Sequence, residues 1–153
     1  MQTTASQGSL AAAADAAAAP DAAPGADLPA QQAGALILIG IALWFVAAML
    51  LRQVAPLGVF DGWARALLYA LIVPGTWPFV LLTRRLVRLG KAQIVPGIAL
   101  VTAAALMADS VVFAWFPWIY GAAQFHRDCA AAVFWGASAG LLLSFVAART
   151  PKR

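Results

Sequence analysis

One carboxylate lies inside a long apolar run of this sequence, and it is the residue best suited to chemistry. The run is ALMADSVVFAWFPWIY, over residues 105–120, and the carboxylate is Asp109. In a membrane helix, a carboxylate that faces lipid costs about 2.5 to 3.5 kcal/mol even on the most lenient insertion scale. We therefore expect Asp109 to face other helices. There it could relay protons or cations, anchor a polar ligand, or form half of a buried pair that fixes helix register.

The expected partner of Asp109 is an arginine. A buried carboxyl group either stays protonated and donates a hydrogen bond, or is ionised beside a cation. Long basic side chains can bend inward from helix ends, which makes Arg52 the first choice and Arg65 the second. The protonated alternative would donate to a hydroxyl group. The candidate hydroxyl groups are those of Thr102, Ser138 and Ser144.

The other reactive residues are too few for the common catalytic sites. The chain has one cysteine, Cys129, and one histidine, His126. It therefore lacks the cysteine pair of a thiol oxidoreductase and the two histidines of a bis-histidine haem. The triplet HRD over residues 126–128 matches the kinase catalytic loop by chance, because the other kinase motifs are missing. With no metal-ligand cluster in the sequence, we expect no enzymatic activity, no metal and no cofactor.

Composition places the elements that carry these residues in a membrane. Hydrophobic residues make up 63% of the chain and charged residues only 10%, whereas soluble domains hold about 25% charged residues. The formal charge of +4 does not indicate a nucleic-acid partner, because the basic residues lie at the edges of apolar runs and form no basic face. The sequence thus predicts an integral membrane protein whose main partner is the lipid bilayer.

Four apolar runs are each long enough to cross a hydrocarbon core of about 30 Å, which takes roughly 20 residues. Because lipid cannot satisfy an open backbone, we expect them to be helices. The predicted fold is all-α, an integral membrane four-helix bundle over residues 33–149. The four spans are placed at 33–51, 64–82, 97–117 and 129–148. An Ala/Pro/Asp-rich tail, 1–32, is expected to be disordered, and a short basic tail, 150–153, follows the bundle.

The basic residues predict how the four spans are oriented. One side of the membrane would carry seven of them, Arg84, Arg85, Arg88, Lys91, Arg149, Lys152 and Arg153. The other side would carry three, Arg52, Arg65 and Arg127. Because basic residues concentrate in cytoplasmic loops, both termini are expected in the cytoplasm. The acidic N-terminal tail leaves the opposite orientation open as the alternative.

Small residues recur every four positions along the fourth run. They are Ala132, Gly136, Gly140 and Ser144. This GxxxG pattern lets two helix backbones approach each other closely. We expect it to form a seam inside the bundle, and the alternative is a homodimer face.

The order of these segments resembles a family of small bacterial four-helix membrane proteins known only as a domain of unknown function. The resemblance covers residues 34–147 and includes Arg52 at the end of the first helix, the LMAD segment with Asp109, and the FPWIYG turn. It implies the four-helix topology in the bacterial inner membrane, and no activity. Small multidrug exporters are a poorer match, because their membrane glutamate lies in the first helix and residues 35–51 hold no acid.

Two functional hypotheses follow from these observations. The leading one is a structural or accessory membrane protein in which Asp109 pairs with an arginine. The alternative is a small dimeric proton-coupled transporter that uses Asp109. A proton relay normally needs several ionisable groups inside the membrane, and the other three spans have none near the middle. No residue identifies a ligand.

Overall fold

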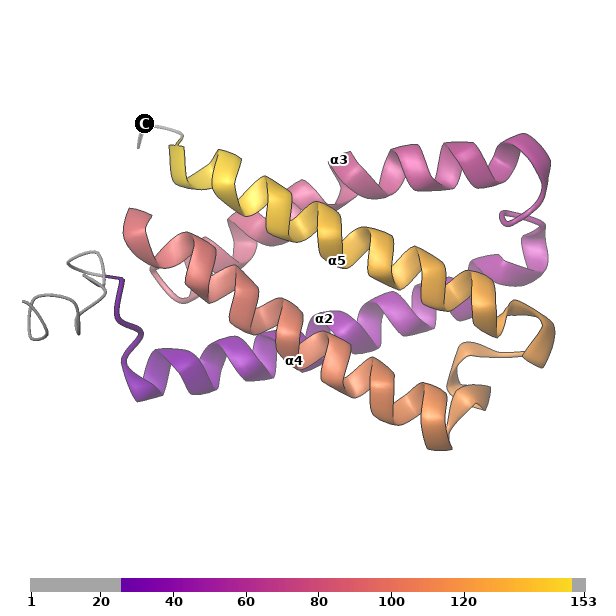
Figure 1. Ribbon diagram of the computed structural model, residues 1–153, viewed down its shortest axis with the longest axis horizontal. Coiled ribbons are helices and arrows are strands. Elements are labelled where there is room, and N and C mark those ends of the chain that lie inside the picture. The colour runs from indigo at the N-terminus through magenta and orange to yellow at the C-terminus, as the bar shows by residue number, and fades with distance from the viewer. Residues whose placement is uncertain (1–25, 150–153) are drawn as a thin grey trace, which may run out of the picture.

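Four long helices form the part of the chain that the computed structural model describes, residues 26–149 (Figure 1). They are α2 (Ala30–Val54), α3 (Gly62–Leu86), α4 (Ile94–Trp115) and α5 (His126–Arg149). Short 3-10 helices lie in the connections, namely η1 (Ala55–Leu57), η2 (Lys91–Gln93), η3 (Pro117–Tyr120) and η4 (Ala123–Phe125). No strand occurs within residues 26–149. The predicted all-α fold is confirmed.

All four helices are long and apolar enough to cross a membrane, as the sequence predicts. Three of them begin three residues earlier than predicted and α3 begins two residues earlier. Ala30 already starts α2, so this helix includes the last three residues of the predicted tail. The helix α4 begins at Ile94 because Pro96 lies in its first turn, where the missing N–H is not needed. The remaining residues of both predicted tails, 1–25 and 150–153, lie outside the described range.

The helices pack in an order that differs from their order along the chain. The helix α2 packs on α4, α4 packs on α5, and α5 packs on α3, whereas the consecutive helices α2 and α3 approach each other little. In Figure 1, α2 begins and α5 ends at one end of the bundle, which we call the terminal end. The α2–α3 and α4–α5 connections lie together at the other end, the loop end.

Two clusters of buried apolar residues hold the bundle, one toward each end. The cluster at the loop end consists of Ala48, Leu51, Ala55, Phe60, Val112, Tyr120, Cys129 and Ala132. The cluster toward the terminal end consists of Leu36, Val80, Leu89, Ile94, Ile98, Val101 and Ala147. Large apolar side chains cover much of the outer surface as well, on every long helix. A lipid-facing exterior explains this distribution, because hydrocarbon imposes no penalty on exposed apolar side chains.

A glycine of α2 lies at a close contact with α4. A Cβ atom built on Gly40 would lie 2.5 Å from the carbonyl oxygen of Val101 and 3.0 Å from the Cβ of Ala104. No real side chain fits at that distance from a backbone atom, so Gly40 allows α2 and α4 to cross closely. This contact brings the two helices that carry Trp44 and Asp109 together.

Candidate functional site

The side chain of Asp109 faces the interior of the bundle, as the sequence predicts. It is 4% exposed. Its Oδ1 atom accepts a hydrogen bond from the indole Nε1 of Trp44 at 2.8 Å and another from the hydroxyl group of Tyr120. Trp44 comes from α2 and Tyr120 from η3, so one carboxyl oxygen connects three separate elements. We call these three residues the Asp109 cluster.

The chain reverses after α4, and this reversal brings Tyr120 back to Asp109. Only Phe116 separates the end of α4 from Pro117, which starts η3, since proline cannot continue the hydrogen-bond ladder. Gly121 follows with a φ of 92°, a conformation that glycine adopts at little cost. Tyr120 is fully buried, and its ring stacks on Phe113 with centroids 4.5 Å apart.

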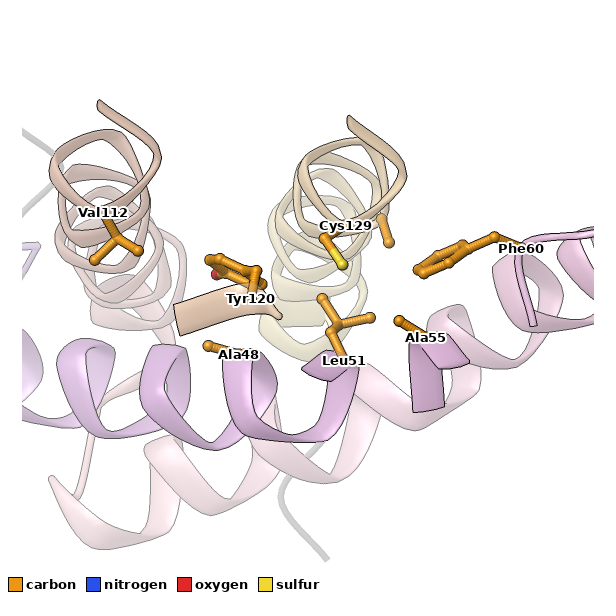
Figure 2. Packing of buried hydrophobic residues seen from close by; sticks show 8 residues of the cluster. Ala48, Leu51, Ala55, Phe60, Val112, Tyr120 and Cys129 are labelled. Atoms are coloured by element: carbon orange, nitrogen blue, oxygen red, sulfur yellow. The ribbon is translucent and has the colours of Figure 1, made fainter. Parts of the chain in front are cut away.

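Figure 2 shows the ring of Tyr120 lying above Ala48 and Leu51 of α2, between Val112 of α4 and Cys129 of α5. Burial among these residues raises the pKa of the Tyr120 hydroxyl, and the neighbouring Asp109 carboxyl raises it further. The phenol therefore stays protonated around neutral pH, and it serves as a hydrogen-bond donor.

Arg52 does not pair with Asp109, and the predicted ion pair is wrong. Its Nη1 atom lies 3.5 Å from the carbonyl oxygens of Trp118 and Ile119. The guanidinium group is exposed at the loop end, where an arginine avoids the cost of entering hydrocarbon. Arg52 therefore contacts the turn that carries Tyr120, and it reaches Asp109 only indirectly through that turn.

The second predicted partner, Arg65, also lies away from Asp109. Its Nε atom donates to the carbonyl oxygen of Phe60 at 2.7 Å, and its Nη2 atom lies 3.4 Å from Oδ1 of Asp128. This ion pair joins the starts of α3 and α5. Both side chains are partly exposed, and such pairs contribute little to stability.

None of the hydroxyl groups considered as partners of Asp109 bonds to it. Ser138 donates to the carbonyl oxygen of Phe134 and Ser144 donates to that of Leu141, each within its own helix. Thr102 borders the same cavity as Asp109 and makes no hydrogen bond with it. The sequence therefore identified the buried acid and missed both of its true donors.

All four helices border a central cavity of about 390 Å³. Its wall is almost entirely apolar, and Asp109 is the one charged residue among those that line it. Both donors of the Asp109 cluster converge on Oδ1, so Oδ2 has no donor among residues 26–149. No fully buried side-chain oxygen in this range lacks a partner, so Oδ2 keeps some accessible surface, which we assign to the cavity that Asp109 borders.

The cavity opens on the side where α2 and α3 approach each other little. Four of the residues that line it are exposed, and all four belong to these two helices. They are Val46, Ala47 and Leu50 of α2 and Phe79 of α3. In a membrane this side faces the acyl chains, so the opening leads to lipid.

The small residues of α5 face α3 in this chain. A Cβ atom built on Gly136 would lie 3.5 Å from Ile72, and one built on Gly140 would lie 3.4 Å from Thr76. Ala132 and Ser144 are buried on the same helix. These contacts place the glycines at an α3–α5 seam inside the bundle. Whether this helix also forms a homodimer stays a prediction.

The remaining reactive residues form no cluster with Asp109. His126 contacts the carbonyl oxygen of Gly121 through Nε2 at 3.0 Å, and Cys129 is buried without a disulfide. In the part of the chain that the structure describes, no group of three His, Cys, Asp or Glu side chains could hold a metal ion.

Comparison with known proteins adds no relative: no family model matches the chain, and neither a curated protein nor a solved structure matches it. The resemblance to a family of small bacterial membrane proteins therefore stays a prediction.

Proposed function

We propose that this chain is a structural or accessory component of the bacterial cytoplasmic membrane, without enzymatic activity, in which the Asp109 cluster fixes the arrangement of the helices. The observation that carries the proposal is the convergence of two donors, from α2 and from η3, on one oxygen of a buried carboxyl group of α4. A polar contact of this kind specifies one register among many apolar alternatives.

Energetic magnitudes favour this structural role. A typical hydrogen bond contributes about 1 kcal/mol net, and one to a charged group about 1.5 to 3 kcal/mol. Apolar contacts between helices have no hydrophobic driving force in lipid, because acyl chains are as apolar as the side chains. The two hydrogen bonds of Asp109 therefore discriminate between helix registers more strongly than most contacts around them.

Two substitutions of Asp109 test this role. Asp109→Asn keeps a carbonyl oxygen that accepts hydrogen bonds from Trp44 and Tyr120. Asp109→Leu removes the acceptor and leaves both donors without a partner. We expect the thermal unfolding midpoint in lipid nanodiscs to fall slightly for Asn and strongly for Leu. Asp61→Asn is the matched control, because Asp61 is exposed at the start of α3 and makes no capping hydrogen bond. Equal midpoints for the Leu variant and wild type would overturn the proposal.

A small dimeric proton-coupled transporter is the second candidate, and the position of Asp109 at the cavity wall favours it. Transport requires the carboxyl group to bind and release a proton, and an amide cannot do so. The Asp109→Asn variant should then keep its unfolding midpoint and lose proton-coupled uptake in proteoliposomes. If the role is structural alone, neither the wild type nor the Asp109→Asn variant should show proton-coupled uptake.

A further inference from the structure

The central cavity has the size of a ligand site. The cavity is open at one side and holds about 390 Å³. Small-molecule pockets span about 300 to 1,000 Å³ and combine apolar walls with a few placed polar groups. Here the placed group is the Oδ2 atom of Asp109, which lacks a donor within residues 26–149 and is open to the cavity.

The chemistry around Oδ2 defines what the cavity can hold. No basic side chain lines the cavity, so the described residues supply no cation to Asp109. The opposite oxygen is held by Trp44 and Tyr120, and such donors stabilise the carboxylate that remains once the carboxyl group has given up its proton. A bound molecule that brings a nitrogen able to take up a proton would complete the site.

We propose that the cavity binds a lipophilic amine, with the amine nitrogen at Oδ2 of Asp109 and the apolar body between α2, α3 and α5. This role goes beyond the structural one, which depends on Oδ1. The exposed lining residues Val46, Leu50 and Phe79 lie at the side that faces acyl chains. The amine therefore enters from the bilayer and need not cross a water-filled path.

Binding involves one proton transfer and needs no other reactant. A neutral amine entering from lipid meets the protonated carboxyl group, and the nitrogen lone pair takes the proton from Oδ2. The products are an ammonium group and a carboxylate joined by a charge-assisted N–H···O bond. No net charge enters the hydrocarbon. An alcohol cannot accept this proton, and a fatty carboxylate brings a net negative charge into the hydrocarbon, so both bind more weakly.

The experiment uses the full chain in lipid nanodiscs with a photoreactive alkylamine that carries a diazirine on its chain. Labelled residues are located by mass spectrometry, and decylamine, decanol and decanoate compete with the probe. We expect the label on residues that line the cavity. We also expect decylamine to compete at a concentration roughly tenfold lower than decanol, as one charge-assisted bond implies.

Three variants separate the cavity from general lipid contact. Ala47→Phe places a large ring at the mouth and should abolish cavity labelling. Ala42→Phe is its matched control, because Ala42 is exposed on the same helix and does not line the cavity. Asp109→Asn keeps the acceptor for Trp44. In this variant, decylamine should compete with the probe only at the concentration that decanol requires.

The outcomes decide the inference independently of the structural role. Label spread evenly over the lipid-facing surface, or equal competition by decylamine and decanol in wild type, overturns the amine site. Loss of labelling in both Ala47→Phe and Ala42→Phe overturns it as well, since the loss then does not depend on blocking the cavity. Should Asp109→Asn fail to fold, the comparison of the two alanine variants still decides, and the unfolding midpoints report on the structural role separately.

Discussion

At the residue scale, the hydroxyl group of Tyr120 can be removed without changing the ring that stacks on Phe113. Tyr120→Phe takes one of the two donors from Asp109, and we expect it to lower the unfolding free energy by about 1 to 3 kcal/mol, because a buried acceptor loses a partner. Chemical or thermal unfolding in nanodiscs measures the loss. Tyr69→Phe is the control, since the Tyr69 hydroxyl makes no hydrogen bond within the described range. Equal losses in both variants would contradict a specific role for Tyr120.

The raised pKa of the Tyr120 hydroxyl predicts a loss of stability in alkaline solution. An unfolded tyrosine ionises near pH 10, whereas the folded group ionises only at a higher pH. The contribution of Tyr120 is therefore fully present below about pH 10 and declines as the pH rises above it, because only the unfolded state releases the proton. The difference in unfolding midpoint between wild type and Tyr120→Phe should shrink over this range. A difference that stays constant up to the alkaline limit argues against the mechanism.

The sequence predicts the inward-facing acid and not the residues that bind it. Asp109 is identifiable because a carboxylate in an apolar run must avoid lipid. Trp44 lies within an apolar run and counts among the hydrophobic residues, and Tyr120 reads as an interfacial aromatic residue. Both carry an N–H or O–H group that needs an acceptor when buried, and this is the signal that could have linked them to Asp109. The reversal after Pro117 that closes the distance requires the structure.

At the element scale, the four helices were predictable and their neighbours were not. A membrane sets the length and hydropathy of each span, so every predicted span lies almost entirely within an observed helix. Lipid solvates an apolar helix face as well as another helix does, and hydropathy therefore carries no information on which helices pack together. Only the small residues of α5 gave such information, and they do face another helix.

Gly40 gives a prediction for the α2–α4 crossing. A methyl group at this position would meet the Val101 carbonyl oxygen at 2.5 Å, so the helices must separate. We expect Gly40→Ala to cost about 1 to 3 kcal/mol by overpacking, which exceeds the gain of up to about 1 kcal/mol from replacing a helical glycine. The unfolding midpoint in nanodiscs measures the net change.

Gly34→Ala is the matched control for Gly40, because it lies on the same helix and a Cβ there would meet nothing within 4 Å. The control should be neutral or slightly stabilising, since alanine restricts the unfolded chain. If both variants stabilise the protein, α2 and α4 do not cross as closely as the structure shows. A distance between spin labels on the two helices would locate the separation in the Gly40 variant.

At the scale of the whole molecule, the packing order determines where the bundle is open. Because α4 and α5 lie between α2 and α3 in this order, the first hairpin is splayed and its inner faces border the cavity. The Asp109 cluster keeps the loop end closed through η3, and the apolar cluster that includes Leu36 and Ile98 packs the terminal end. The structure thus combines two packed ends with one lateral opening toward lipid.

The basic residues predict the orientation of the whole bundle, and changing them tests this prediction. The terminal end would carry seven and the loop end three, which predicts cytoplasmic termini. Replacing Arg84, Arg85, Arg88 and Lys91 by Gln leaves three basic residues on each side and removes the bias. A C-terminal alkaline phosphatase fusion should be inactive on the wild-type chain and active on a substantial fraction of this variant. Replacing Arg52, Arg65 and Arg127 by Gln, the control, strengthens the bias and should leave the fusion inactive. An active fusion on the wild-type chain would show that the acidic N-terminal tail, and not the basic loops, sets the orientation.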